Sequence, residues 1–272
     1  MIAVARELMR YRELMLTLAW KSVVVRYKQA YLGLLWSVLK PLLLMAIFTV
    51  VRSFVGIDSG EIPYPVLTFA ALMPWVLFQE ATSESVNSVV SHAAIVRKVY
   101  FPREVFPITA VVTKLVEFGI NALVLAVLMA WYGIAPATEI LWVPLLVAYT
   151  LVATLAVGFA GAAANVYYRD VTSLLPVALS LLMYLSPVIY PLDLVRRKLL
   201  EQQAAGEWSE LLFRLYTANP LAGIIDGFQR AVLKGLAPDP DVIWPGLVTT
   251  ALLLPLSYRF FKRAEARFAD VI

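Results

Sequence analysis

Residues 140–164 read ILWVPLLVAYTLVATLAVGFAGAAA, a continuous apolar stretch that is longer than the roughly 20 residues a helix needs to cross a bilayer. Gly158, Gly161 and the alanines around them would let neighbouring helices approach closely, as small residues do between helices in membranes. The stretch therefore predicts a transmembrane helix that packs against others.

Stretches of this kind recur from one end of the chain to the other. We expect six transmembrane helices, at residues 32–51, 64–90, 105–131, 140–164, 171–190 and 242–260. The composition agrees, because 61% of the 272 residues are hydrophobic and 15% are charged, whereas soluble domains have about 45–50% apolar and about 25% charged residues. The predicted fold class is an all-α integral membrane protein, with residues 1–272 forming a single transmembrane domain.

Two segments outside these spans are amphipathic. Residues 1–30 place apolar side chains at roughly helical spacing among six Lys and Arg residues, a pattern typical of a helix that lies in the membrane interface. Residues 91–104 are too charged to lie in lipid, and Phe101 and Pro102 close a short amphipathic element there. We expect both segments at the membrane surface.

The region at residues 192–241 predicts neither a span nor a simple loop. Pro187 and Pro191 end the span before it, because proline lacks an amide hydrogen and clashes with the preceding turn. The apolar runs inside the region are too short to cross a bilayer. Asn219 is the expected N-cap, and Pro220 the expected first residue, of one short helix.

The distribution of Lys and Arg in the loops predicts the orientation of the chain, since cytoplasmic loops carry an excess of both. With the N-terminus inside, 14 of the 23 Lys and Arg residues lie in cytoplasmic segments, and the two short outer loops contain only Arg52. The long outer segment contains six more, but long segments follow the rule weakly. Six spans with both termini in the cytoplasm fit this distribution.

Residues needed for most catalytic chemistry are missing from the sequence. The chain has no cysteine and one histidine, His92, so we expect no thiolate chemistry and no metal site. Neither Gly-Lys-Ser nor Gly-Lys-Thr occurs, which excludes a phosphate-binding P-loop in this chain. The net charge of +4 does not predict nucleic-acid binding here, because basic residues in a membrane protein mark its cytoplasmic face. We expect no catalytic residue, no cofactor and no nucleic-acid partner.

Three ionisable side chains within the expected spans are candidates for function, since charges at membrane depth are costly. Glu80 and Glu84 share a helix face and could relay protons or bind a cation, although a hydrated helix end explains them as well. Lys40 could contact a substrate phosphate together with Arg26 and Lys28, or its ammonium could reach back to the cytoplasmic interface.

Aromatic residues form a further set of candidates, toward the ends of the expected spans. They are Tyr31, Trp36, Trp75, Phe78, Tyr184 and Tyr190. Aromatic belts at the two membrane interfaces are the general explanation for such positions. Rings that face a pore would instead let a sugar chain slide past without tight binding, because they are flat and apolar with polar edges. Both interpretations are compatible with the sequence.

Six short motifs extend over nearly the whole chain. They are RYKQAYLGLLWSVLKPLL (26–43), LMPWVLFQEA (72–81), IVRKVYFPREVFP (95–107), NVYYRDV (165–171), LSPVIYP (185–191) and NPLAGIIDGFQR (219–230). Each motif is weak alone, but the combination resembles the permease subunits of ABC-2 type polysaccharide exporters, in particular the O-antigen (Wzm-like) class.

This resemblance implies an assembly. The expected complex is a homodimer of six-helix subunits in the cytoplasmic (inner) membrane, with two copies of a separate ATPase subunit that would bind ATP and magnesium. A coupling helix at residues 95–103 would fit a cleft in the ATPase, and two short re-entrant helices within 192–241 would form a gate at the outer mouth. The implied coupling residues are Arg97, Lys98, Val99, Tyr100, Phe101, Pro102 and Arg103.

The resemblance also implies a substrate, a polysaccharide attached to a polyprenyl diphosphate lipid. The hypothesis that follows has the diphosphate held by Arg26, Lys28 or Lys40, while ATP-driven closure of the partner shifts spans one and five. The aromatic candidates would then line the channel.

Other functions fit parts of the sequence. Teichoic acid or capsule exporters share the same motifs. An ion-coupled transporter would use Glu80 and Glu84, but we find no residue-level internal repeat of the kind such transporters often show. A membrane-embedded glycosyltransferase or phosphatase lacks candidate catalytic residues.

Overall fold

The computed structural model describes residues 35–56, 62–98, 101–204 and 209–272, and six isolated helical positions between residues 13 and 24. Every regular element in these ranges is helical, so the all-α prediction is confirmed for the described chain. The elements are α3 (Leu35–Val55), α4 (Tyr64–Ser91), α5 (Ala93–Val96), α6 (Val105–Trp131), η1 (Thr138–Trp142), α7 (Val143–Tyr167), α8 (Val171–Tyr184), α9 (Leu192–Ala204), α10 (Ser209–Thr217), α11 (Pro220–Gln229), η2 (Arg230–Lys234), α12 (Pro240–Glu265) and α13 (Phe268–Val271). The expected interfacial helix at residues 1–30 lies largely outside the described residues.

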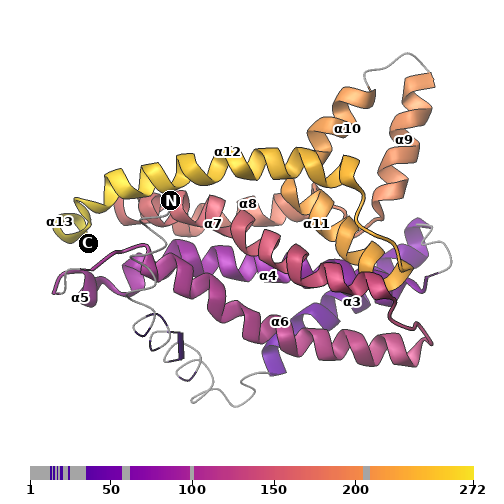
Figure 1. Ribbon diagram of the computed structural model, residues 1–272, viewed down its shortest axis with the longest axis horizontal. Helices are drawn as coiled ribbons and strands as arrows, with labels where there is room; N and C mark the ends of the chain where they lie inside the picture. Colours follow the sequence, from indigo (N-terminus) through magenta and orange to yellow (C-terminus); the bar gives the residue numbers. More distant parts are fainter. Residues whose placement is uncertain are drawn as a thin grey trace.

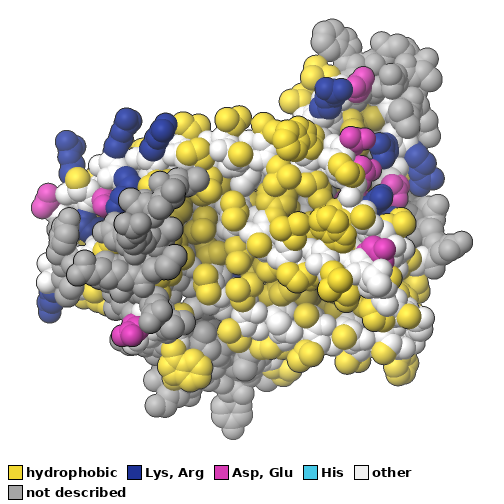
Figure 2. All heavy atoms as spheres, viewed as in Figure 1, with side chains coloured by type: hydrophobic (Ala, Val, Ile, Leu, Met, Phe, Trp, Pro, Cys, Tyr) yellow, Lys and Arg dark blue, Asp and Glu magenta, His cyan; other side chains and the backbone are white. Residues whose placement is uncertain are grey.

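Four helical stretches are long and apolar enough to cross a membrane. They are Leu35–Phe54, Val105–Trp131, Thr138–Tyr167 and Pro240–Glu265. Figure 2 shows hydrophobic side chains over the middle of the visible face and charged side chains gathered at its two ends. An apolar belt between charged ends is what a hydrocarbon layer around the middle of a protein requires. The pattern indicates a multi-pass membrane protein.

The other two expected spans, residues 64–90 and 171–190, differ from these four. Helix α4 has 28 residues, which is long enough, but its glutamate, serine and asparagine side chains make it less apolar. Helix α8 has only 14 residues and ends at Tyr184 instead of residue 190. At about 21 Å it is shorter than the roughly 30 Å of a bilayer core.

The chain turns directly after α8, and hydrogen bonds hold this turn. The hydroxyl of Tyr190 donates to the carbonyl oxygen of Tyr184 at 2.8 Å, and the side-chain amide of Asn219 donates to the hydroxyl of Ser186 at 2.9 Å. These contacts hold residues 185–190 in a turn at the helix end, so the helix expected over residues 171–190 ends at Tyr184.

The described part of residues 192–241 forms three short α-helices instead of the two expected. Helices α9 and α10 make a hairpin that projects from one end of the bundle (Figure 1). Helix α11 lies inside, packed against α4, α7 and α12, and residues 221–229 are all buried. Asn219 is its N-cap, because the side-chain oxygen accepts the amide of Leu221 at 3.1 Å, and Pro220 is its first residue. Both predictions for this helix start are confirmed.

Helix α4 lies at the centre of the bundle and packs against α3, α6, α7, α8 and α11 (Figure 1). Its contact with α7 depends on two glycines. A Cβ added at Gly161 would lie 2.5 Å from Cγ2 of Val86, and one added at Gly158 would overlap the side chain of Ser85. The close approach expected from these glycines is confirmed, and van der Waals contacts between the two helices are the result.

We predict that Gly161→Leu separates α4 from α7 and destabilises the folded protein, by about 1–3 kcal/mol for an overpacked site. The measurement is the thermal unfolding of the purified chain in detergent. Gly119→Leu is the matched control, because a Cβ at Gly119 on α6 would meet nothing within 4 Å. Equal melting temperatures for the two variants would contradict this account of the α4–α7 contact.

Candidate functional site: a polar stripe on helix α4

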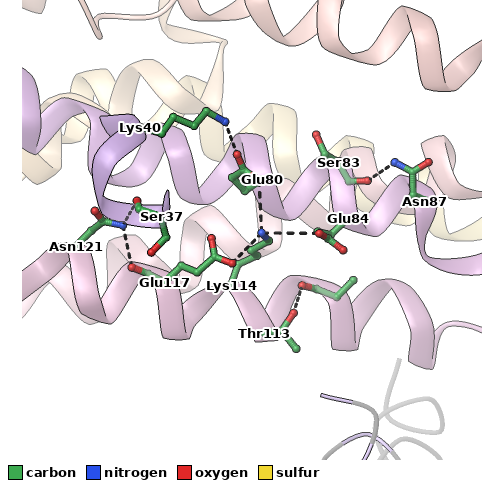
Figure 3. Close-up of polar contacts among 11 residues, drawn as sticks. Ser37, Lys40, Glu80, Ser83, Glu84, Asn87, Thr113, Lys114, Glu117 and Asn121 are labelled. Atoms are coloured by element: carbon green, nitrogen blue, oxygen red, sulfur yellow. Dashed lines mark hydrogen bonds and ion pairs between the residues drawn. The ribbon is translucent and has the colours of Figure 1, made fainter. Parts of the chain in front are cut away.

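One face of α4 carries a polar stripe, which we define as Glu80, Ser83, Glu84, Asn87 and Ser91. These residues follow the spacing of a single helix face, and Figure 3 shows four of them in line along the helix. Each is half-buried or exposed, whereas the other residues between positions 80 and 89 are buried. Helix α4 therefore presents polar groups on the one side that its neighbours leave partly open.

Lys114 on α6 provides a buried positive charge that faces the two carboxylates of the stripe. Only 4% of its side chain is exposed, and its Nζ lies 3.0 Å from Glu117 Oε1, 3.5 Å from Glu80 Oε2 and 3.9 Å from Glu84 Oε1. A lysine at the centre of a membrane helix costs about 2.5–3.5 kcal/mol on insertion scales, so such residues pair with carboxylates. This pairing attaches α6 to α4 by charge as well as by packing.

Helix α3 joins the same cluster through Lys40. The Lys40 ammonium donates a hydrogen bond to Oε1 of Glu80, whose other oxygen faces Lys114 (Figure 3). The side-chain amide of Asn121 on α6 donates to the carbonyl oxygen of Ser37 at 3.2 Å, which adds a second polar link to α3. Lys40 thus has a carboxylate partner within the chain, and Glu80 bridges two lysines from different helices.

The polar contacts continue at the far end of the stripe. Asn165, at the end of α7, donates to Oδ1 of Asn87 at 3.2 Å, and its own oxygen accepts the hydroxyl of Thr172 at 2.9 Å. Thr172 is the second residue of α8. Polar contacts therefore join α4 to α3 and α6 at one end of the stripe, and to the end of α7 and the start of α8 at the other.

The exposure of these charges is the informative feature of the cluster. The side chains of Lys40, Glu80 and Glu84 are 48%, 29% and 41% exposed in the isolated chain, while Lys114 is covered. Charges at membrane depth face water or another polypeptide but not lipid. The open side of the stripe is accordingly a surface that meets water or a second subunit.

The structure places the aromatic candidates in different surroundings. Trp36 and Tyr184 are exposed and Tyr190 is half-buried, so their rings reach the surface of the chain. Trp75 and Phe78 lie in the interior, where they belong to a core cluster with Leu72 and Ile224, and their rings are not available to a passing molecule in this conformation. Tyr31, with the diphosphate candidates Arg26 and Lys28, lies outside the described residues.

The coupling candidates lie beside the end of the chain. Arg97 and Lys98 are exposed, Phe101 and Pro102 are buried, and Val99 and Tyr100 lie outside the described residues. In the described part of residues 91–104, the only helix is the four-residue α5. The Arg97 guanidinium donates to the carbonyl oxygen of the last residue, Ile272.

A second ion-pair cluster fixes this segment to α12. Glu104 is buried, and its carboxylate accepts Lys262 Nζ at 3.0 Å and the hydroxyl of Tyr258 at 3.3 Å. The Arg103 guanidinium donates to the carbonyl oxygen of Glu265 and lies 5.9 Å from the ring centroid of Phe268. A displacement of residues 101–104 would therefore pull directly on α12.

Sequence reasoning missed Lys114, Glu117 and Glu104. The first two stand three residues apart inside the apolar stretch 105–131, where intramembrane charges of opposite sign signal a site. Glu104 carried no such signal, because charged neighbours surround it in the sequence. Its role depends on residues 158 positions away and follows only from the fold.

We predict that Lys114→Met destabilises the protein by about 3–5 kcal/mol, because it leaves an uncompensated charge in a buried ion pair. The double variant Lys114→Met/Glu117→Gln removes the nearest carboxylate charge as well and should recover part of the loss. Thermal unfolding in detergent of both variants and of Glu117→Gln gives the coupling between the two side chains. Additive effects of the two substitutions would contradict the buried pair.

Known proteins resemble this chain over most of its length. The family described as ABC-2 type transporter matches residues 13–201, more than half of the chain. An O-antigen export system permease protein of Myxococcus xanthus is 28% identical over 273 residues, which cover all of both chains. One of Klebsiella pneumoniae is 27% identical over 96% of this chain and 95% of the relative, and the polysialic acid transport protein of Escherichia coli is 21% identical over 79% of each. The resemblance inferred from the motifs is thereby confirmed, and the chain belongs to the ABC-2 type transporter family.

Proposed function

We propose that this chain is the membrane subunit of an ATP-driven exporter that moves polyprenyl-diphosphate-linked polysaccharide of the O-antigen type across the cytoplasmic membrane. Family membership supports a transport role, and relatives of full length are named as O-antigen export permeases. The sequence contains no P-loop, so a separate ATPase subunit would bind ATP and magnesium and supply the energy. Capsular polysaccharide is the second candidate substrate, because a more distant relative is named for polysialic acid transport.

The polar stripe is the observation that carries this proposal. A chain alone in lipid would expose Lys40, Glu80 and Glu84 to hydrocarbon, which is unfavourable for all three. Two copies that face each other across the stripe would instead enclose a passage where these charges meet water. A hydrated passage with weakly binding walls suits a polysaccharide, whose hydroxyl groups need hydrogen-bonding partners throughout the crossing.

A six-span topology with both termini in the cytoplasm fits this assembly. Helix α4 would cross at the centre of the subunit, shielded by its neighbours, and α8 together with residues 185–190 would complete the remaining span. Figure 1 shows α5 and the C-terminus at one end of the bundle and the α9–α10 hairpin at the other. This separation supports a cytoplasmic coupling face and an outer region formed by residues 192–241, in which α11 would contribute to the gate.

Separate groups of residues would bind the diphosphate, contact the sugar chain and transmit the movement of the ATPase. Lys40, with Arg26 and Lys28 nearby in sequence, would receive the diphosphate, and Lys40 would then exchange the Glu80 carboxylate for phosphate oxygens. The rings of Trp36, Tyr184 and Tyr190 would contact the sugar chain. Closure of the ATPase would push on residues 97–103, and the Arg103 and Glu104 contacts would carry the movement to α12.

We predict that the chain moves glycan only together with its cognate ATPase. The test reconstitutes the two subunits in liposomes, adds lipid-linked O-antigen, and measures ATP hydrolysis and the glycan protected from external glycosidase. The complex should hydrolyse ATP faster when the lipid-linked glycan is present, and it should protect the glycan. The chain alone should neither hydrolyse ATP nor protect the glycan. Transport by the chain without ATPase or ATP would overturn the proposed function.

The same assay tests the coupling contacts with Arg103→Ala. Loss of the link to α12 should reduce glycan-dependent stimulation by a factor within the range of about 5- to 150-fold that coupling energies give, while basal ATP hydrolysis persists. Arg169→Ala is the matched control, because Arg169 is an exposed arginine of the α7–α8 connection that forms no hydrogen bond or ion pair with α12 among the described residues. Equal glycan-dependent stimulation in Arg103→Ala and Arg169→Ala would contradict the coupling role of Arg103.

A further inference from the structure

A cavity that is separate from the polar stripe lies at the end of the bundle that carries the α9–α10 hairpin. It has a volume of about 1010 Å³, at the upper end of the roughly 300–1,000 Å³ typical of ligand sites. Its walls come from η1, the start of α7, the hairpin and the first turns of α12. None of the residues in the candidate site or the coupling segment lines it.

The wall of the cavity is mostly apolar and continuous with the hydrophobic belt. Leu145 and Trp244 line it and are exposed, Trp244 to 67%. Tryptophans concentrate where the hydrocarbon layer meets the headgroups, and Trp142 is a second one on this wall. The two tryptophans therefore favour a position of the cavity at the border between the acyl chains and the headgroups.

Helix α10 forms part of the same cavity wall. Its three leucines at positions 211, 212 and 215 are exposed, while Glu210 and Arg214 form an ion pair of 2.7 Å on the same helix. A short helix with exposed leucines and charged neighbours is typical of the membrane interface. Figure 2 shows hydrophobic side chains and charges of both signs close together in this part of the surface.

The charged side chains that the described residues place on the cavity wall are balanced. Two are positive, Arg196 and Arg214, and two are negative, Glu210 and Asp241. The Arg214–Glu210 pair is more than two-thirds exposed on both sides, so it contributes at most about 1 kcal/mol and either partner is free to exchange. Arg196 lies over the ring of Phe213 at 5.6 Å and 3.5 Å from Asp239, which keeps its guanidinium at the wall.

We propose that this cavity binds one zwitterionic phospholipid of the phosphatidylethanolamine type. The phosphate would be held by Arg196 and Arg214, and the ammonium by Glu210 and Asp241, while the acyl chains follow Leu145, Trp244 and Leu247 into the belt. An anionic lipid would satisfy the two arginines and meet two uncompensated carboxylates. A sugar chain would stack on Trp142 and Trp244, but most of its hydroxyl groups would lie opposite a wall rich in leucine and proline.

The test is native mass spectrometry of the delipidated full-length protein, titrated in detergent with dioleoylphosphatidylethanolamine or dioleoylphosphatidylglycerol. The unsubstituted chain should bind the ethanolamine lipid about tenfold more tightly than the glycerol lipid, a difference of about 1.4 kcal/mol. Arg196→Gln/Arg214→Gln should weaken binding of the ethanolamine lipid by a similar factor. Glu210→Gln/Asp241→Asn should reverse the preference, because the two positive charges of Arg196 and Arg214 then outweigh the single negative charge of Asp239 beside Arg196.

Arg197→Gln is the matched control, since this exposed arginine is the neighbour of Arg196 and does not line the cavity. The melting temperature of each variant is compared with that of the unsubstituted chain. Only variants that remain folded are used to compare lipid binding. Equal binding of both lipids by the unsubstituted chain, or an unchanged preference in the Glu210/Asp241 variant, would overturn the proposal. The proposal would also be overturned by an oligosaccharide fragment that displaces the bound lipid from the unsubstituted chain but not from Arg196→Gln/Arg214→Gln.

Discussion

The contact between Lys114 and the carboxylates of Glu80, Glu84 and Glu117 is the constraint on which the rest of this structure depends. A buried ammonium in a membrane helix requires counter-charges, and these come from α4 and from α6 itself. Glu80 then has a second oxygen that accepts Lys40 from α3. One cluster of five charges therefore sets how three helices lie against one another, and it leaves its open side polar.

Regions with different proposed tasks lie around this polar side. The α4–α7 contact, which needs Gly158 and Gly161, forms a rigid centre behind the stripe. At one end, Glu104 and Lys262 connect the coupling segment to α12, and at the other end the buried helix α11 packs against the same α12. Helix α12 thus touches both the proposed input of force and the proposed gate, which makes it the candidate element for transmitting movement through the subunit.

Much of this architecture could be predicted from the sequence, because apolar length and helix-start chemistry are local properties. Residues 105–131, expected as a span, are the residues of α6, and the cap at Asn219 follows from two adjacent side chains. The early end of α8 depends on contacts with residue 219, and the interior positions of Trp75 and Phe78 depend on what packs around α4. The partners of Lys40, Glu80 and Glu84 come from other helices, so the residues were recognisable as candidates but their network was not.

The central claim is that the open side of the polar stripe faces water within the membrane. Because the chain has no cysteine, a single Glu84→Cys variant in lipid nanodiscs can be labelled with a charged maleimide without further changes. Leu123→Cys, on the exposed apolar surface of α6, is the reference for a position that faces lipid. The account predicts that the cysteine at position 84 reacts at least about tenfold faster than the one at position 123, since thiolates form in water and not in hydrocarbon. Equally slow reaction at both positions would contradict it.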